Sequence, residues 1–412
     1  MDQTPLSYEE AIARLAEAQR FGINPSLDGM RSLAQRLLGG RMECHCVQVT
    51  GTNGKTSVAR MTGALLTEAG YRTGVYTSPH LNSYTERVVI DGTPVPEAEF
   101  AAALGDVFEA ADALGGGFTE FELLTAAAFL IFRRRKVEWA VLEVGMGGRW
   151  DATSIVEPDV AVITGVGLDH TDRLGTTREE IAADKSHIIK RGSIVVVGPG
   201  CNGVEDIVIN RAIQLCSPAI IRIGVGNEPH VTWKIVRRPR TPRGTLTVDV
   251  TAHGVRTFRV SLHAPSYQAP NVATAAGAAG MALLNTGSHH GALMTFESLR
   301  DLTFPGRFEL LRETPPLVID GAHNPQAAEV LATAIGEAFS KEPPVVVLAV
   351  LADKDAEGIV RGLAPVTHAF IATDNGSPRC MPAGELASVV ERCTGARPLA
   401  EPDLMRALRA AD

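Results

Sequence analysis

The spacing of apolar residues in the first 70 positions predicts two helices, a strand and a third helix. Ser7, followed by acidic residues, is typical of a capped helix start, and apolar residues from Ile12 to Ala18 supply the buried face of that helix. A second, short helix is predicted near Leu33–Leu38. The apolar run Val47–Thr50 predicts a strand that enters a glycine-containing turn, and Ser57–Ala69 predicts the helix that follows it.

Further apolar runs alternate with helical stretches along the first half of the chain. These runs predict strands at Thr73–Tyr76, Trp139–Val144, Val160–Thr164 and Ile194–Val197. Because helices separate most of these strands, the pattern favours an α/β fold with a mostly parallel, doubly wound sheet.

The rest of the chain predicts a second, smaller α/β unit. A β-like, arginine-rich stretch, Ile220–Leu262, and a small-residue helix, Asn271–Leu284, flank the first core, and Asn285–Thr295 is typical of a linker. A chain of 412 residues exceeds what one core usually supports. We therefore predict domains at 1–294 and 295–412. The second contains strands at Leu317–Ile319 and Val345–Val350 and a helix at Pro325–Phe339.

Composition narrows the class of protein. The net charge of −8 argues against a nucleic-acid binder that relies on phosphate neutralisation, and the arginine cluster between Arg237 and Arg243 is interleaved with prolines, as in a solvated loop. Six cysteines without metal-ligand spacing predict reduced thiols. The acidic N-terminus is unlike a signal peptide, and no apolar run is long enough to span a membrane. A cytoplasmic enzyme is the simplest interpretation.

The strongest local motif lies between the first predicted strand and its helix. Its glycines let backbone N–H groups turn toward phosphate oxygens, and Lys55 reaches the β- and γ-phosphates. A hydroxyl of Thr56 or Ser57 would complete a magnesium shell. Val49 stands where longer phosphate loops have a glycine, and the alternative is an ordinary tight turn. The predicted ATP-binding loop consists of Gly51, Thr52, Asn53, Gly54, Lys55, Thr56 and Ser57.

Polar residues also follow other predicted strands. Glu143 ends one strand, where a carboxylate faces the ligand crevice of a doubly wound sheet, although a surface carboxylate beside a glycine loop is the alternative. His170 follows another strand and would by itself more often be structural. Lys185, on a predicted helix, and Asp320 with His323, before another, are weak signals in isolation. Together with the phosphate loop, the strand ends favour a metal–phosphate site.

Several motifs in order resemble the signatures of folylpolyglutamate synthase and dihydrofolate synthase, within the wider Mur ligase group. The most specific are Val47–Lys55 and Leu142–Arg149, the second followed by Asp151–Thr153. The resemblance covers nearly the whole chain, through Ser78–Leu81, Phe121–Glu122, Leu168–Thr171, Ile188–Lys190, Pro305–Glu309 and Asp320–Pro325.

The resemblance implies an N-terminal P-loop ATPase domain, a C-terminal Rossmann-like domain and catalysis in the cleft between them. The implied reaction joins L-glutamate to dihydropteroate, to the γ-carboxylate of (tetrahydro)folate, or to both. It proceeds through an acyl phosphate and releases ADP and phosphate. ATP and two Mg²⁺ ions are the implied cofactors. A monomer that acts on small molecules, without nucleic acid or membrane, is expected.

Individual roles are also implied by the resemblance. The magnesium ligands are Ser57, Ser78, Glu143, His170 and Lys185, and Lys185 carries a carbamate. Further nucleotide contacts are Asn271, Arg307 and Asp320, while His323 serves phosphate or glutamate. The catalytic residues are then Lys55, Glu143, His170, Lys185 and His323. The pterin acid is expected near Ile23, Phe121, Glu122, Trp150, Asp151 and Ala152.

The sequence departs from the family pattern at several positions. Thr56 stands where the family usually has glycine, Trp150 replaces a leucine and is expected to reshape the pterin pocket, and Tyr267 stands where histidine is more usual. The family also continues beyond Asp412 into a last strand and a Gly-Ser turn. The second domain is therefore expected to be truncated at its end, or to use a neighbouring segment for part of the glutamate site.

Two other functions are compatible with a phosphate loop in an α/β chain. A Mur-type ligase for a nucleotide-linked cell-wall precursor needs an extra N-terminal domain, and about 46 residues before the strand Val47–Thr50 and its loop are too few for it. A regulatory nucleotide-binding protein without ligase activity is the other; Lys55, Glu143 and His170 argue against it. The sequence does not separate dihydrofolate synthase from folylpolyglutamate synthase.

Overall fold

The chain folds into two compact units, which are described separately. The structure is a computed structural model that describes residues 6–22, 25–40, 42–224, 228–287 and 294–412. Unit 1 comprises Met1–Trp233, Val250–Val260 and Pro270–Leu302, and unit 2 comprises Lys234–Asp249, Ser261–Ala269 and Thr303–Asp412. Two short segments of the predicted first domain, Lys234–Asp249 and Ser261–Ala269, therefore belong to unit 2. The domain bounds at 294/295 stay a prediction.

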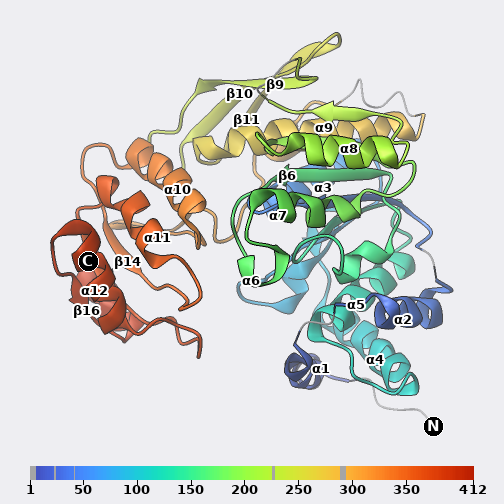
Figure 1. The fold of residues 1–412 in the computed structure, drawn as a ribbon, viewed down its shortest axis with the longest axis horizontal. Coiled ribbons are helices and arrows are strands. Elements are labelled where there is room, and N and C mark those ends of the chain that lie inside the picture. The colour runs from blue at the N-terminus through green and yellow to red at the C-terminus, as the bar shows by residue number, and fades with distance from the viewer. Residues whose placement is uncertain (1–5, 23–24, 41, 225–227, 288–293) are drawn as a thin grey trace. The chain divides into compact units, whose positions relative to one another are not determined.

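Unit 1 is built on one eight-stranded sheet with helices on both faces (Figure 1). The strand order is β4-β3-β2-β5-β1-β6-β7-β8. Six neighbouring strands from β2 to β8 are parallel, whereas β3 and β4 add an antiparallel edge. The strands are β1 (His45–Thr50), β2 (Thr73–Tyr76), β3 (Val88–Ile90), β4 (Thr93–Pro94), β5 (Trp139–Glu143), β6 (Val160–Gly165), β7 (Ile194–Gly200) and β8 (Ile220–Arg222). The predicted fold class is confirmed.

Some helices of unit 1 begin at caps that the sequence encodes. Ser7 and Glu10 form a capping box at α1, and Thr119 and Glu122 form another at α5. The second helix is longer than the predicted Leu33–Leu38 because it begins at Asp28. The helices are α1 (Tyr8–Glu17), α2 (Asp28–Leu38), α3 (Lys55–Glu68), α4 (Glu97–Ala113), α5 (Glu120–Arg134), α6 (Thr171–Leu174), α7 (Arg178–Lys185), α8 (Glu205–Gln214) and α9 (Ala269–Asn285).

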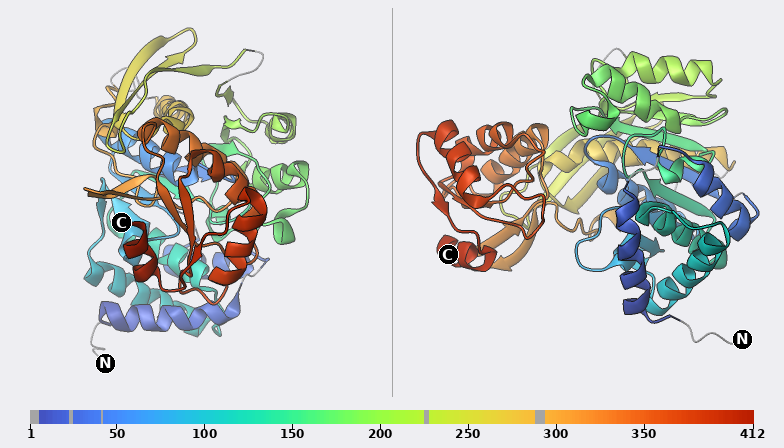
Figure 2. Two further views of the ribbon diagram at one scale, coloured as in Figure 1. Left: turned by 90° about the vertical axis from the view of Figure 1, so that its left-hand side faces the viewer. Right: turned by 60° about the horizontal axis from the view of Figure 1, so that its bottom comes forward.

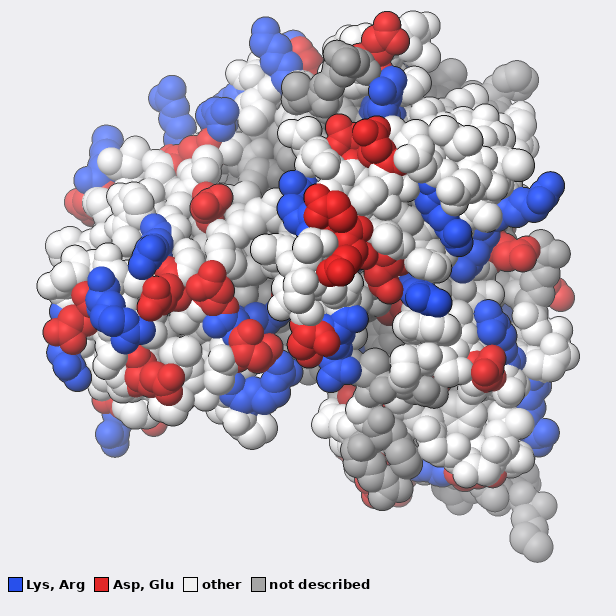
Figure 3. Space-filling view, in the orientation of Figure 1, with Lys and Arg blue, Asp and Glu red and all other residues white. Residues whose placement is uncertain are grey.

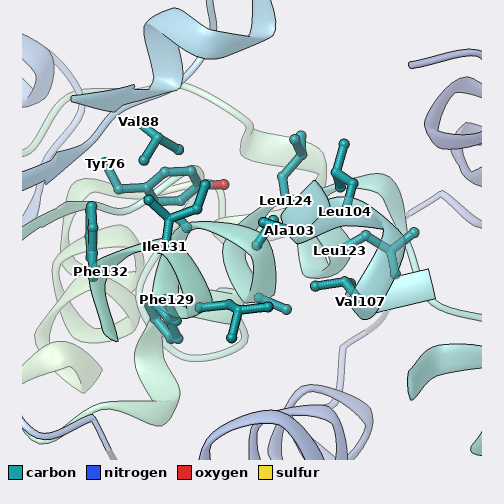
Figure 4. Close-up of a cluster of buried hydrophobic side chains, with 14 of the residues drawn as sticks. Tyr76, Val88, Ala103, Leu104, Val107, Leu123, Leu124, Phe129, Ile131 and Phe132 are labelled. Carbon is teal, nitrogen blue, oxygen red and sulfur yellow. The ribbon is translucent and has the colours of Figure 1, made fainter. Parts of the chain in front are cut away.

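A large apolar core lies between α4, α5 and one face of the sheet (Figure 4). Phe129, Ile131 and Phe132 of α5 pack with Tyr76 of β2 and Val88 of β3, all with at most 1% of their surface exposed. Burying side chains of this size contributes roughly 1.5–3 kcal/mol each. This packing holds β2 and β5 in place, and both strands end at the candidate site described below.

Unit 2 contains two small sheets. In one, β12 (Glu309–Glu313) and β13 (Pro316–Ile319) pair antiparallel, and in the other, β14 (Val345–Leu348), β15 (Ala369–Ala372) and β16 (Leu399–Ala400) run parallel. The helices of this unit lie around the parallel sheet (Figure 2). They are α10 (Pro325–Ala338), α11 (Ala356–Leu363), α12 (Ala383–Thr394) and α13 (Leu404–Ala411). A three-stranded sheet of β9 (Val231–Arg237), β10 (Thr245–Ala252) and β11 (Arg256–His263) contains residues of both units.

Acidic and basic side chains are interspersed on the face of the molecule that Figure 3 shows. In unit 2 they form exposed pairs such as Arg379–Asp353 and Arg392–Glu357. Exposed pairs of this kind contribute little to stability, about 0–1 kcal/mol each. No helix among the described residues is long and apolar enough to cross a membrane. The predicted linker Asn285–Thr295 falls partly on residues 288–293, which lie outside the described residues.

Candidate functional site

Four parallel strands of unit 1 end side by side at one edge of the sheet. In the order β2-β5-β1-β6, these strands lead into the segments that begin at Thr77, Val144, Gly51 and Val166. The register pairs Val49 of β1 with Glu143 of β5. Ligands of doubly wound sheets bind outside such carboxyl ends. The candidate site is therefore the edge where the phosphate loop, Gly51–Ser57, lies beside Glu143.

The phosphate loop turns directly into a helix whose first turn lacks a side-chain cap. Gly54 is the N-cap of α3 with φ of 84°, a left-handed conformation that favours glycine. Gly54 has no side chain that could cap the helix, and the N-terminus of a helix suits an anion. Lys55 Nζ donates to the carbonyl oxygens of Gly51 and Thr52, at 2.9 and 3.2 Å. The lysine therefore folds back over its own loop.

Hydrogen bonds to β6 fix the loop in place. The Thr52 N–H donates to Gly165 O at 2.9 Å, and Thr164 Oγ1 donates to Asn53 O at 2.6 Å. The approach is close, since a Cβ on Gly51 would lie 2.0 Å from Thr164 Oγ1. A Cβ on Gly54 would lie 2.7 Å from Asn271 Oδ1, so the first turn of α9 also borders the loop. Asn271 was predicted to contact the nucleotide.

Glu143 is held by segments that follow both strands neighbouring β5. Its Oε1 accepts a hydrogen bond from Thr56 Oγ1 at 2.8 Å, and its Oε2 accepts one from the Ser78 N–H at 3.1 Å. Only 1% of the Glu143 surface is exposed. The predicted metal ligands Glu143 and Ser78 are thus brought together, and Ser57 is buried one residue beyond Thr56 on α3.

Two aspartates shape the glycine loop that follows Glu143. Asp151 Oδ2 accepts from the Gly145 and Met146 N–H groups, at 2.9 and 3.1 Å, while Oδ1 accepts from the Thr153 N–H and hydroxyl. Burial raises the pKa of Asp151, and these hydrogen bonds oppose that shift. Gly148 N–H donates to Asp184 Oδ1 at 2.9 Å. Both carboxylates therefore hold the backbone of this loop in position.

Lys185 is a buried cation at the end of α7. Only 4% of its surface is exposed. Burial, together with the charge of Lys55, lowers the pKa of Lys185 to about 7. A Cβ on Gly148 would lie 2.6 Å from the Lys185 carbonyl oxygen, so the glycine loop packs tightly against this end of the helix. The amine is thus largely neutral at slightly alkaline pH, which makes it a nucleophile.

His170 lies on the same edge, in the segment after β6. It has φ of 50°, and its backbone N–H donates to Asp169 Oδ1 at 2.9 Å. Its side chain is 44% exposed, and Nε2 lies 3.9 Å from Asp169 Oδ2. Within the described ranges, no group of three His, Cys, Asp or Glu side chains is arranged to hold a metal. The predicted metal set differs from such a group because it also uses hydroxyls and a modified lysine.

The residues predicted to contact a pterin lie in different environments. The ring centroids of Phe121 and Tyr76 are 6.1 Å apart, and a Cβ on Gly145 would lie 2.8 Å from the Phe121 ring, so Phe121 borders the glycine loop. Trp150 is 45% exposed and lies under the Arg149 guanidinium, 4.9 Å from the ring centroid. Its indole is an exposed surface beside the site.

Three other predicted pterin contacts are Glu122, Ala152 and Ile23. Glu122 Oε2 accepts from the Thr119 N–H and hydroxyl in the α5 capping box. Glu122 Oε1 has no hydrogen-bond partner among the described residues and borders a pocket of about 250 Å³ that Gly29 also lines. Ala152 is buried at the start of a 3₁₀ turn, and Ile23 lies outside the described residues.

The predicted residues of unit 2 gather around Asp320. Asp320 Oδ2 accepts from the Phe308 N–H at 2.8 Å and from the Tyr267 hydroxyl at 3.2 Å, and Oδ1 accepts from the Ala322 N–H at 2.8 Å. Burial raises the pKa of Asp320, whereas the charge of Arg307 opposes that rise. His323 is exposed, and its Nδ1 lies 2.8 Å from Gly321 O.

Two threonines that fix the site were missing from the predicted set. Besides Thr164, described above, Thr50 Oγ1 donates to Gly147 O at 2.6 Å and joins β1 to the glycine loop. Each threonine is the last residue of a predicted apolar strand, Thr50 in Val47–Thr50 and Thr164 in Val160–Thr164. A polar residue closing an apolar strand is a signal that would have identified them.

Comparisons with known proteins give the class of this fold and site. Residues 49–279 match the Mur ligase middle domain, and residues 306–412 match the domain described as Mur ligase, glutamate ligase domain. The phosphate loop and the carboxylate at the sheet edge of this chain are therefore those of an ATP-dependent, Mur-type ligase. The dihydrofolate synthase/folylpolyglutamate synthase of Mycobacterium tuberculosis is 36% identical over 387 residues, which cover 89% of this chain and 77% of that protein. The chain belongs to the dihydrofolate synthase/folylpolyglutamate synthase family.

Solved structures agree with this assignment. A folylpolyglutamate synthase from Mycobacterium tuberculosis, complexed with ADP and AMPPCP, matches with a TM-score of 0.87 and 33% identity, over 97% of this chain and 91% of that one. A bifunctional folylpolyglutamate synthase/dihydrofolate synthase with Mn, AMPPNP and L-glutamate bound matches with a TM-score of 0.82 and 29% identity, over 99% and 93%. These relatives bind adenine nucleotides, and the second also binds a divalent metal.

Proposed function

We propose that this protein is an ATP-dependent ligase that joins L-glutamate to dihydropteroate, to the γ-carboxylate of a folate, or to both. The observation that carries the proposal is the sheet edge of unit 1, where the uncapped first turn of α3 lies beside Glu143, with Thr56 and Ser78 hydrogen-bonded to that carboxylate. Family membership and the ligands of the solved relatives support the choice of glutamate and ATP.

The loop suits the phosphates of ATP. Gly51 and Gly54 allow the loop to pack closely against Thr164 and Asn271, and the loop leads directly into the N-terminus of α3, where backbone N–H groups suit phosphate oxygens. Lys55 is held over the loop by two carbonyl oxygens and would exchange these for phosphate oxygens. Its role is to offset negative charge as the phosphoryl group is transferred.

The donor set also suits magnesium. Carboxylate, hydroxyl and carbonyl oxygens are the ligands that Mg²⁺ prefers, and Glu143, Ser57 and Ser78 supply such oxygens at this edge. We propose these residues and His170 as the holders of two magnesium ions. The ions supply charge neutralisation on the phosphates.

Lys185 is proposed to carry a carbamate. Its neutral amine would attack CO₂, forming an N–C bond and releasing one proton, and the product is an anion in place of a cation. A pKa lowered to about 7 by burial supports this step, because only the neutral amine reacts. The test is ¹³C NMR of protein equilibrated with ¹³C-bicarbonate. A carbamate resonance that is absent from the Lys185→Met variant is expected, and an identical spectrum for the two proteins would exclude the modification.

The proposed chemistry has two bond exchanges. An oxygen of the substrate carboxylate attacks the γ-phosphorus of ATP, and the bond to the ADP oxygen breaks. The glutamate amino group then attacks the acyl carbon, loses a proton and displaces phosphate, which leaves an amide. Phe121 and Trp150, which border the glycine loop, are the proposed contacts of the flat pterin ring. We also propose a cytoplasmic monomer that acts on small molecules.

The test is glutamate-dependent ADP release with ATP and magnesium, comparing dihydropteroate with tetrahydrofolate. Turnover with both acids would show a bifunctional enzyme, and turnover with one would assign the activity. The Lys55→Ala variant is expected to lose about 10²–10³-fold in kcat, because one positioned donor to the developing charge is removed. A folded protein that binds ATP but releases no ADP in response to glutamate with either acid would refute the proposal.

A further inference from the structure

Thr56 is the residue of the phosphate loop that touches the proposed metal carboxylate. Its hydroxyl donates to Glu143 Oε1 at 2.8 Å. Thr56 and Ser57 are two adjacent hydroxyl residues that follow Lys55. Ser57, which the resemblance assigns to magnesium, is the next residue on α3. Because successive helical residues project about 100° apart, the two hydroxyls face different directions.

The hydrogen bonds fix Glu143 from two sides. Thr56 holds Oε1 and the Ser78 N–H holds Oε2, and these partners follow β1 and β2, the two strands that flank β5. Arg60 lies one turn beyond Thr56, and its pKa is lowered by burial while the charge of Glu143 opposes that shift. A carboxylate with 1% of its surface exposed is therefore oriented by neighbouring groups before any ligand arrives.

We propose that Thr56 is a positioning residue that presets Glu143 for a divalent cation, in addition to the ligands that the family pattern supplies. This inference deepens the proposed function and rests on it for the identity of the metal site. The physical reason is the cost of ordering. A side chain that is already fixed loses less conformational freedom when the ion binds, so the ion binds more tightly.

Three substitutions separate the hydroxyl from the shape of the side chain. Thr56→Val removes the hydroxyl and keeps the volume, Thr56→Ser keeps the hydroxyl, and Thr62→Val is the matched control on the same helix. Thr62 is fully buried, and its hydroxyl has no hydrogen-bond partner among the described residues. Thr56→Ala replaces Thr56→Val if the valine variant does not fold.

The measurement is Mn²⁺ binding to the nucleotide-free protein, followed by the EPR signal of free Mn²⁺. Thr56→Val is expected to raise the Mn²⁺ dissociation constant about tenfold, equivalent to about 1.4 kcal/mol, while Thr56→Ser and Thr62→Val bind like the parent protein. Unchanged or tighter binding by Thr56→Val would overturn the inference. So would a serine variant that binds as weakly as the valine variant.

A double-mutant cycle tests whether Thr56 acts through Glu143. In a Glu143→Gln background, the further loss caused by Thr56→Val is expected to vanish, because the carboxylate to be positioned is absent. A full tenfold loss in that background would contradict a positioning role. The readout does not depend on turnover. Weakened Mn²⁺ binding without glutamate-dependent ADP release would refute the proposed function alone, and turnover with unchanged Mn²⁺ binding would refute this inference alone.

Discussion

The two units each use a buried carboxylate just after a strand, but they use it differently. Glu143, at the end of β5, accepts hydrogen bonds from segments that follow β1 and β2, far apart in the sequence. Asp320, after β13, accepts two of its three hydrogen bonds from backbone groups within twelve residues and the third from Tyr267. Glu143 therefore connects the ends of three strands of the large sheet. Asp320 mainly stabilises the turn in which it lies.

This difference shows where stability and function are coupled. At the edge in unit 1, Thr164 joins β6 to the phosphate loop, Thr50 joins β1 to the glycine loop, and Asp184 joins the glycine loop to α7. A change in one segment is therefore transmitted to the others. Around Asp320, a lost contact remains local. Substitutions in unit 1 are accordingly expected to have larger effects than those in unit 2.

The largest effect is expected from the buried amine of Lys185. Its pKa is lowered from the ordinary 10.5 to about 7, so between these values the unfolded chain binds more protons than the folded one. Stability therefore rises with pH in this window, and the penalty of burying the charge is fully present below about pH 7. Within this pH window, the free energy of unfolding of the parent protein should rise by about 1.4 kcal/mol per pH unit relative to that of the Lys185→Met variant.

The measurement is urea unfolding of both proteins from pH 7 to pH 9.5, without bicarbonate or metal. A difference in unfolding free energy that stays flat over this range would show that Lys185 is not a buried, neutral amine. Both proteins share every other titrating group, so their difference isolates this residue.

A smaller effect is expected from Gly148→Ala. Its new Cβ would lie 2.6 Å from the Lys185 carbonyl oxygen and 2.9 Å from that of Asp184, both backbone atoms that cannot rotate away. Overpacking of this kind costs about 1–3 kcal/mol. Gly280→Ala, in α9, is the matched control, because no atom lies within 4 Å of its Cβ position. That variant should be more stable by roughly 0.5–1 kcal/mol. Equal unfolding midpoints for the two variants would contradict the tight packing of the glycine loop on α7.

The smallest effect is expected from Tyr267→Phe in unit 2. The substitution removes the 3.2 Å hydrogen bond to Asp320, while the Phe308 N–H still donates to the same oxygen. The free energy of unfolding should fall by about 1 kcal/mol, which thermal unfolding would measure. A loss greater than that of Gly148→Ala would reverse the proposed contrast between the units.

Much of the fold could be predicted because the apolar runs are short, buried and separated by amphipathic helices. The strand at Thr73–Tyr76 was predicted with its observed bounds, and the helix at Pro325 began where Asn324 caps it. Leu33–Leu38 was too short a prediction because its helix begins at Asp28 without a side-chain cap at Leu27. Capping signals, where they exist, are what locate a helix start in a sequence.

The sequence predicted the motifs of the candidate site better than the hydrogen bonds between them. Glycines and Lys55 are informative because few residues can replace them at a phosphate loop. The hydrogen bond from Thr56 to Glu143 joins residues 87 positions apart, and no local pattern reveals which of two adjacent hydroxyls turns toward the carboxylate. Asp151 was predicted as a pterin contact, yet both its oxygens accept from the loop and from Thr153, so any role toward a pterin stays a prediction.

The most direct test of the account is to follow an oxygen atom. Ligation should be run with a substrate acid whose carboxylate is labelled with ¹⁸O, and the released phosphate should be analysed by mass spectrometry. If the carboxylate attacks the γ-phosphorus and phosphate then leaves the acyl carbon, each phosphate carries one labelled oxygen. Amide formation with unlabelled phosphate would contradict the acyl-phosphate route that the phosphate loop and Glu143 are proposed to support.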